Sequence, residues 1–217
     1  AAVVVSLHFA VAEAEARREA VARAEANAAV SRFLVDMLTS ADPERAQGEN
    51  LTLREALDRA ADSASATLGD QPLVQAQVKG TLAASYRSLG DIARAEVLFD
   101  EALALAGRDT DEDSVQLRLG RIATLLDAAR FDEGLAEIDA LLGEIDDFPE
   151  SASAPWSARL ERGRALLGLG RNAEALALLR GIVDASERIA GLDAEVGIQA
   201  RHNLASALRT SGEFAES

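Results

Sequence analysis

Four stretches of this 217-residue chain repeat one pattern of residue sizes. A small or aliphatic residue is followed three positions later by a large apolar residue, and four positions after that by glycine or alanine. The stretches begin at Ala83, Ile122, Gly163 and Ala205, and they end at Gly90, Ala129, Gly170 and Gly212. The end residues are 39, 41 and 42 positions apart. A repeat of roughly 40 residues is typical of an α-solenoid built from helix pairs.

The sequence predicts a second helix after each of the first three stretches. A small residue lies five positions past the turn, and large apolar residues follow at helical spacing. A small residue allows two helices to approach closely, and a large residue on the neighbouring helix fills the space between them. Only 4% of the residues are aromatic, and no stretch alternates with the period of a strand. The predicted fold class is therefore all-α.

This pattern resembles the tetratricopeptide repeat (TPR) family. The resemblance implies a right-handed solenoid of antiparallel helix pairs. The charged, alanine-rich residues 13–28 predict a long N-terminal helix before it. The second repeat is the weakest match, because Ala129 replaces the turn glycine and Gly134 replaces a packing alanine. The repeat exceeds the usual 34 residues and lacks a closing proline, so the kinesin light chain variant fits better. The repeat-defining residues are Ala83, Tyr86, Gly90, Ala95, Phe99, Gly170, Ala175, Ala205 and Gly212.

The organisation of the chain follows from the repeats and from composition. Thr52 and Glu55 have the spacing of a capping box, which predicts a helix beginning there. The chain has no initiator Met and stops inside the fourth repeat, so we expect a fragment. The expected segments are apolar residues 1–12, a juxtamembrane helix and loop over 13–50, a packing helix over 51–72, and repeats over 73–110, 112–150, 154–192 and 195–217.

Charge and cysteine content exclude several classes of function. The net charge is −15, from 22 basic and 37 acidic residues. Nucleic-acid binding needs clustered Lys and Arg, and so does docking on an anionic membrane surface, so neither is expected. The absence of cysteine excludes disulfides and cysteine-ligated zinc sites. We predict no cofactor and no bound metal.

Residues 1–12 are apolar and contain no acidic residue, lysine or arginine. A helix that spans a bilayer takes about 20 residues. From the residues alone, this segment is either the last half of a membrane helix or a buried helix end.

Three short segments resemble bacterial serine/threonine protein kinases that carry a C-terminal TPR region. They are residues 24–43, with a Phe-Leu and an Ala-Asp-Pro, then residues 53–60, with Leu57-Asp58, then Gln71-Pro72 with Ala76. Their order and spacing match that family, as does a first repeat with Tyr86 and Gly90. In that family a kinase domain and one membrane helix precede these segments. The resemblance therefore implies that residues 1–12 end a membrane helix.

The kinase motifs themselves are missing from this sequence, which has no Gly-rich loop with a strand lysine, no His-Arg-Asp loop and no Asp-Phe-Gly. We therefore predict no catalytic residues, and a protein-interaction scaffold that regulates an attached kinase. The resemblance implies a bacterial inner-membrane location with the repeats on the extracytoplasmic side. The alternative is a stand-alone soluble TPR adaptor in the cytoplasm. Expected partners are proteins or peptides, and self-association is a further expectation.

Two sets of residues are candidates for partner binding. In TPR proteins the first helix of each pair lines a concave groove, and here the corresponding positions become more polar toward the C-terminus. The candidate groove residues are Arg87, Arg164, His202, Asn203, Ser206 and Arg209. A second set, the cationic ladder, occupies one position in all four first helices: Lys79, Arg118, Arg159 and Arg201. The ladder either pairs with acidic residues of adjacent helices or forms a track for an anionic peptide.

Overall fold

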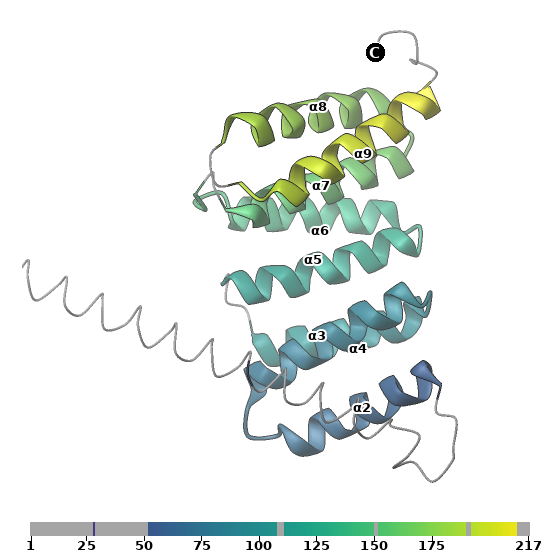
Figure 1. Cartoon of the computed structure of the whole chain (residues 1–217), viewed down its shortest axis with the longest axis vertical. Helices are drawn as coiled ribbons and strands as arrows, with labels where there is room; N and C mark the ends of the chain where they lie inside the picture. The colour runs from purple at the N-terminus through teal and green to yellow at the C-terminus, as the bar shows by residue number, and fades with distance from the viewer. Residues whose placement is uncertain (1–27, 29–51, 108–110, 150–151, 190–191, 212–217) are drawn as a thin grey trace, which may run out of the picture. The chain divides into compact units, whose positions relative to one another are not determined.

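The computed structural model describes residue 28 and residues 52–107, 111–149, 152–189 and 192–211. Every regular element in these ranges is an α-helix (Figure 1), which confirms the all-α prediction. The helices are α2 (Leu53–Thr67), α3 (Pro72–Ser88), α4 (Ile92–Ala106), α5 (Glu112–Asp127), α6 (Phe131–Glu144), α7 (Ser153–Gly168), α8 (Asn172–Arg188) and α9 (Ala194–Ser211).

Three predictions fall outside the described residues. They concern the long N-terminal helix, the membrane segment over 1–12 and the turn at Gly212. No helix of the described part of the chain combines the length and apolar character that crossing a membrane requires. The chain divides into two compact units, Ala1–Leu82 and Ala83–Ser217.

In the first unit, α2 begins with the capping box that the sequence predicts. The Thr52 hydroxyl accepts a hydrogen bond from the Glu55 backbone N–H at 3.3 Å, and the Glu55 carboxylate accepts one from the Thr52 backbone N–H at 2.8 Å. The backbone hydrogen bond from Thr52 lowers the pKa of Glu55. These contacts satisfy donors that the first turn of a helix otherwise leaves unpaired.

In the second unit, the turns that follow α3, α5 and α7 have the same hydrogen bonds. The backbone N–H groups of Asp91, Arg130 and Arg171 donate to the carbonyls of Tyr86, Leu125 and Leu166 at 2.9, 2.9 and 2.8 Å. This bond closes a helix whose last residue is left-handed. The large apolar residue of the repeat pattern therefore supplies both a core side chain and the carbonyl that fixes the turn.

Ala129 adopts the same left-handed backbone as the turn glycines. Its φ is 58°, compared with 78° at Gly90 and 73° at Gly170. A residue with a Cβ is strained in this conformation by about 1–2 kcal/mol. The second repeat therefore keeps the geometry of the others although its sequence departs from the pattern.

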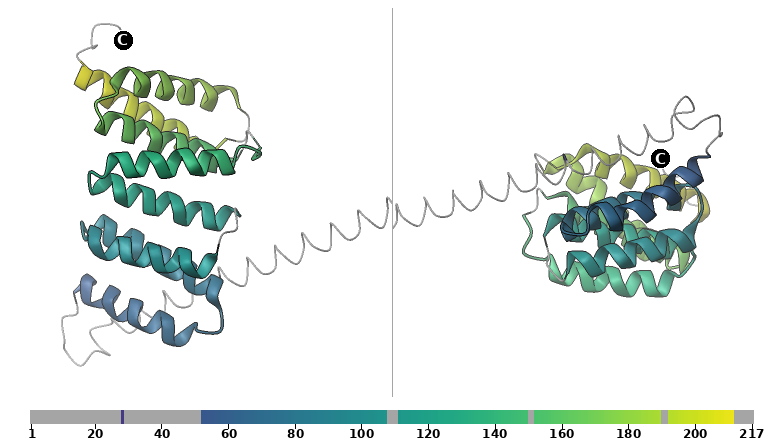
Figure 2. Two further views of the ribbon diagram at one scale, coloured as in Figure 1. Left: turned by 180° about the vertical axis from the view of Figure 1, so that it is seen from behind. Right: turned by 90° about the horizontal axis from the view of Figure 1, so that it is seen from below.

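The helices from α5 to α9 stack one on the next (Figures 1 and 2). Each packs on its neighbour in sequence, from α4 and α5 through to α8 and α9. The first helices of successive pairs also contact each other directly, α5 with α7 and α7 with α9. This double set of contacts is the geometry of a helical-repeat scaffold, in which each pair buries its apolar face only against neighbouring pairs.

Five of the repeat-defining residues are buried. Ala83, Tyr86 and Ala95 are fully buried, as are Ala175 and, within a few per cent, Phe99. Ala205 is exposed on α9, whose expected second-helix partner would begin beyond Gly212, outside the described residues.

The departure at Gly134 has a packing explanation. A Cβ placed on Gly134 would lie 2.5 Å from Cδ2 of Leu126, which is buried. The leucine side chain therefore occupies the space that the alanine methyl takes at Ala95 and Ala175. Gly120 in α5 shows the same relation to Phe99 in α4, because its Cβ would lie 2.5 Å from the end of the ring.

Candidate interaction surface

The first helices of three successive pairs are joined by four charged side chains, Arg87, Asp127, Glu161 and Arg164, which we call the ion cluster. Asp127 at the end of α5 accepts a hydrogen bond from Arg87 of α3 at 3.1 Å and another from Arg164 of α7 at 2.8 Å. Arg164 also donates to Glu161, one turn earlier on α7, at 2.6 Å. Two cations and two anions therefore form one connected and neutral set.

Arg87, Glu161 and Arg164 are half-buried, whereas Asp127 is exposed at the end of α5, and Glu161 is the least accessible member of the ion cluster. Its side chain is 20% exposed, compared with 33% for Arg164. Burial raises the pKa of Glu161 above its ordinary value, even though the neighbouring Arg164 and Arg87 act to lower it. Loss of hydration therefore outweighs the ion pair at this carboxylate.

The structure brings together two of the predicted groove residues, Arg87 and Arg164, through Asp127. Sequence reasoning did not select Asp127 or Glu161. The signal that could have identified Asp127 is the alternation of charge from one repeat to the next. Arg87 and Arg164 lie 40 and 37 residues from Asp127, which is close to one repeat in each direction.

The other four candidate groove residues lie on α9. His202 and Arg209 are exposed, whereas Asn203 and Ser206 are half-buried. In the described part of the chain, no ion pair includes His202 or Arg209. Because α9 packs on α7, polar and accessible side chains continue from the ion cluster onto the next first helix.

The cationic ladder is mostly engaged. Arg118 forms a two-pronged ion pair with Glu144 of α6, with one contact at 3.0 Å, and this pair lowers the pKa of Glu144. Arg201 pairs with Glu187 of α8 at 3.3 Å. Lys79 is 7% exposed. These positions favour pairing with acidic residues of adjacent helices over a continuous cationic track.

Arg159 differs from the other arginines of the ladder. Its guanidinium stacks over the ring of Trp156, with 4.6 Å between the guanidinium carbon and the ring centroid.

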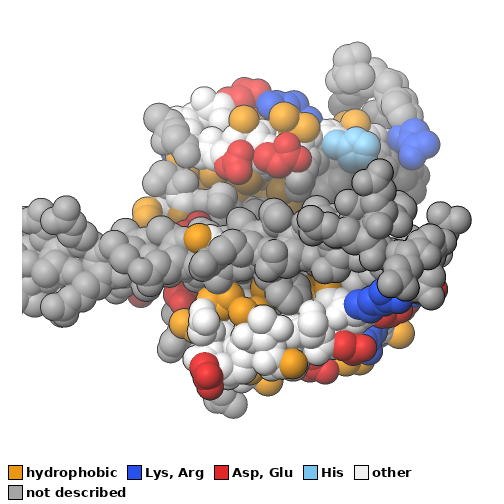
Figure 3. All heavy atoms as spheres, turned by 60° about the horizontal axis from the view of Figure 1, so that its bottom comes forward, with side chains coloured by type: hydrophobic (Ala, Val, Ile, Leu, Met, Phe, Trp, Pro, Cys, Tyr) orange, Lys and Arg blue, Asp and Glu red, His pale blue; other side chains and the backbone are white. Residues whose placement is uncertain are grey.

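In the view of Figure 3, described acidic, basic and apolar side chains are interspersed, and no basic patch stands out.

No group of three or more His, Asp and Glu side chains among the described residues is placed to hold a metal ion. The carboxylates of the ion cluster are tied to arginines.

Comparison with known proteins gives a fold but no family. No family model matches the sequence, and no curated protein matches it. One solved structure with a similar fold is that of nearly identical TPR-like repeats, ascribed to a kinesin light chain, from Podosopora anserina. The TM-score is 0.62 at 15% sequence identity, over 86% of this chain and 90% of that one. The likeness confirms the predicted TPR-like fold.

Proposed function

We propose that this chain is a protein-interaction scaffold that binds its partner across the first helices α5, α7 and α9. The observation that supports this most directly is their side-by-side packing, which presents side chains from successive repeats on one surface. The ion cluster fixes three of the first helices relative to one another and leaves about a third of the Arg164 side chain accessible. A partner of mixed polar and apolar character suits this surface.

Affinity purification with matched variants tests the scaffold function. The chain is immobilised, and proteins retained from the native extract are quantified for the wild type and for an Arg164→Ala, Asn203→Ala double variant. The control is Arg171→Ala, which changes an exposed local pair with Glu174 before α8. We expect retained proteins that the double variant loses and the control keeps. Identical sets for all three proteins would contradict binding across the first helices.

We further propose that the scaffold is the regulatory region of a bacterial membrane-anchored serine/threonine kinase. The order of the short motifs in residues 33–43, 57–58 and 71–72 supports this, together with apolar residues 1–12. In this proposal the repeats lie on the extracytoplasmic side of the inner membrane, and partner binding changes the proximity of the attached kinase domains. Self-association would be one route to that change.

Sequencing the gene upstream of the Ala1 codon tests the kinase link. A completed apolar helix preceded by kinase motifs is the expected result. An initiator codon close to Ala1, with no kinase domain encoded before it, would overturn the link and leave a stand-alone adaptor with the same binding surface.

A further inference from the structure

Arg159 lacks an acidic residue at the position that supplies the ion-pair partner of Arg118, its counterpart one repeat earlier. Arg118 pairs with Glu144, which lies 26 residues later. The residue 26 positions after Arg159 is Ala185, which is buried and apolar. In the described part of the chain, no carboxylate lies within ion-pair distance of Arg159. The guanidinium carbon lies over the Trp156 ring, and a guanidinium carries five N–H donors with which it can bind a further acceptor.

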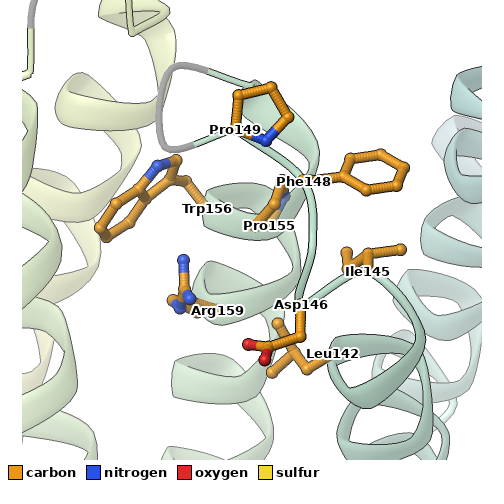
Figure 4. A pocket seen from close by; sticks show the side chains of 8 residues that line it. All are labelled: Leu142, Ile145, Asp146, Phe148, Pro149, Pro155, Trp156 and Arg159. Atoms are coloured by element: carbon orange, nitrogen blue, oxygen red, sulfur yellow. The ribbon is translucent and has the colours of Figure 1, made fainter.

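A cavity of about 250 Å³ adjoins this arginine, at the junction of α6 and α7. Figure 4 shows Trp156 and Arg159 on one side of the cavity and Ile145 and Phe148 on the other. Pro149 and Pro155 complete the lining, and Asp146 is its second charged residue. Six of the eight lining residues are apolar, but the surface that is exposed in the cavity is more polar than apolar. The cavity is smaller than most sites for cofactors or drug-sized ligands, which occupy about 300–1,000 Å³. Its size suits one or two side chains.

The charged residues at the cavity restrict the class of ligand that would bind there. A guanidinium that stacks on an aromatic ring and has no carboxylate partner is suited to pair with a carboxylate. Asp146 disfavours a multiply charged group such as a phosphate, because like charges repel, but its oxygens can accept a backbone N–H. The combination fits a peptide with one acidic side chain beside an apolar one.

We propose that this pocket binds a peptide segment of a partner protein, with one carboxylate held by Arg159 and an adjacent apolar side chain packed on Trp156. The proposal rests on the scaffold function and adds a second, specific contact point. The pocket shares no residue with the ion cluster. A partner that crosses the first helices and also enters this pocket would be recognised by sequence as well as by shape.

Selection of short random peptides displayed on phage tests the pocket. Peptides that bind the full chain are synthesised with their glutamate or aspartate and with the matching amide. Trp156 is the only tryptophan of the chain, so its fluorescence reports binding at this position. We expect selected peptides to pair an acidic residue with an apolar one and to change the Trp156 emission. Replacement of the acidic residue by its amide should weaken binding by about tenfold or more.

The variant Arg159→Gln should cause a similar loss, whereas Arg201→Gln, which removes an exposed arginine of the same ladder, should not. Circular dichroism verifies that both variants fold. If Arg159→Gln does not fold, the acid and amide peptides still decide the question on the wild type. Peptides that bind without changing Trp156 emission and lose affinity only with Arg164→Ala would overturn the pocket and leave the scaffold function standing. Recovery of no binding peptide would also overturn the pocket.

Discussion

Substitution of Gly120 by alanine tests how tightly successive helix pairs pack. A Cβ at Gly120 would lie 2.5 Å from two ring atoms of Phe99. Ordinary contact between carbon atoms is about 3.5 Å or more, so the ring would have to move by about 1 Å. Phe99 is 3% exposed and is enclosed in the core between α4 and α5, where it has little room to move.

The expected change in the free energy of unfolding follows from two opposing effects. Overpacking a core by one methyl group costs about 1–3 kcal/mol. Replacing glycine by alanine within a helix returns about 1 kcal/mol. We therefore expect Gly120→Ala to lower the free energy of unfolding by up to about 2 kcal/mol.

Gly181 provides a matched control for this substitution. It lies inside α8, and a Cβ there would meet nothing within 4 Å. Gly181→Ala should therefore stabilise the chain by about 1 kcal/mol. The two variants should differ by about 1–3 kcal/mol, because the helix-propensity gain is common to both.

Urea denaturation followed by circular dichroism measures both variants. Adding Phe99→Leu to Gly120→Ala removes the ring atoms that clash, so the double variant should be more stable than the sum of the single effects predicts. Equal stabilisation by Gly120→Ala and Gly181→Ala would refute the packing between α4 and α5.

Three further substitutions test the turn and the ion cluster. Ala129→Gly should stabilise the chain by about 0.5–1 kcal/mol in thermal denaturation, because it relieves the left-handed strain at some entropic cost; a loss of stability would contradict that conformation. Asp127→Asn should destabilise by about 1–2 kcal/mol in urea, since it breaks two ion pairs of half-buried arginines, Arg87 and Arg164; no change would show that the cluster adds no stability. The folded-state pKa of Glu161 is raised above the ordinary value of 4.5. The stability that protonated Glu161 contributes is therefore fully present below pH 4.5 and is lost as the pH rises through the folded-state pKa. The stability of Glu161→Gln relative to wild type should therefore increase with pH in that window, and a pH-independent difference would contradict the raised pKa.

The fold could be predicted from sequence because its determinants are local. The turn residue, the large apolar residue four positions before it and the small residue of the second helix all recur within one repeat. The backbone N–H of Arg130 donates to the Leu125 carbonyl across a turn that contains alanine, and the equivalent hydrogen bonds of the other two turns form across glycine. For this reason the second repeat folds like its neighbours.

The binding features were harder to predict because they depend on contacts between repeats. Asp127 bridges Arg87 and Arg164 only once the chain has folded and brought side chains of α3, α5 and α7 together. Likewise, Arg159 and Arg118 share a position in the sequence pattern, but their surroundings differ. Arg118 pairs with Glu144, whereas Ala185 occupies the corresponding position for Arg159. Sequence spacing identifies such positions without showing which of them are satisfied by a neighbour.

Site-specific photo-crosslinking tests the proposed binding surface most directly. A photoreactive amino acid replaces His202, which is exposed on α9, or Ala177, which is exposed on α8, and the chain is irradiated in its native extract. The scaffold proposal predicts a discrete crosslinked partner from position 202 and none from position 177. A partner captured only from position 177, or equally from both positions, would contradict binding across the first helices.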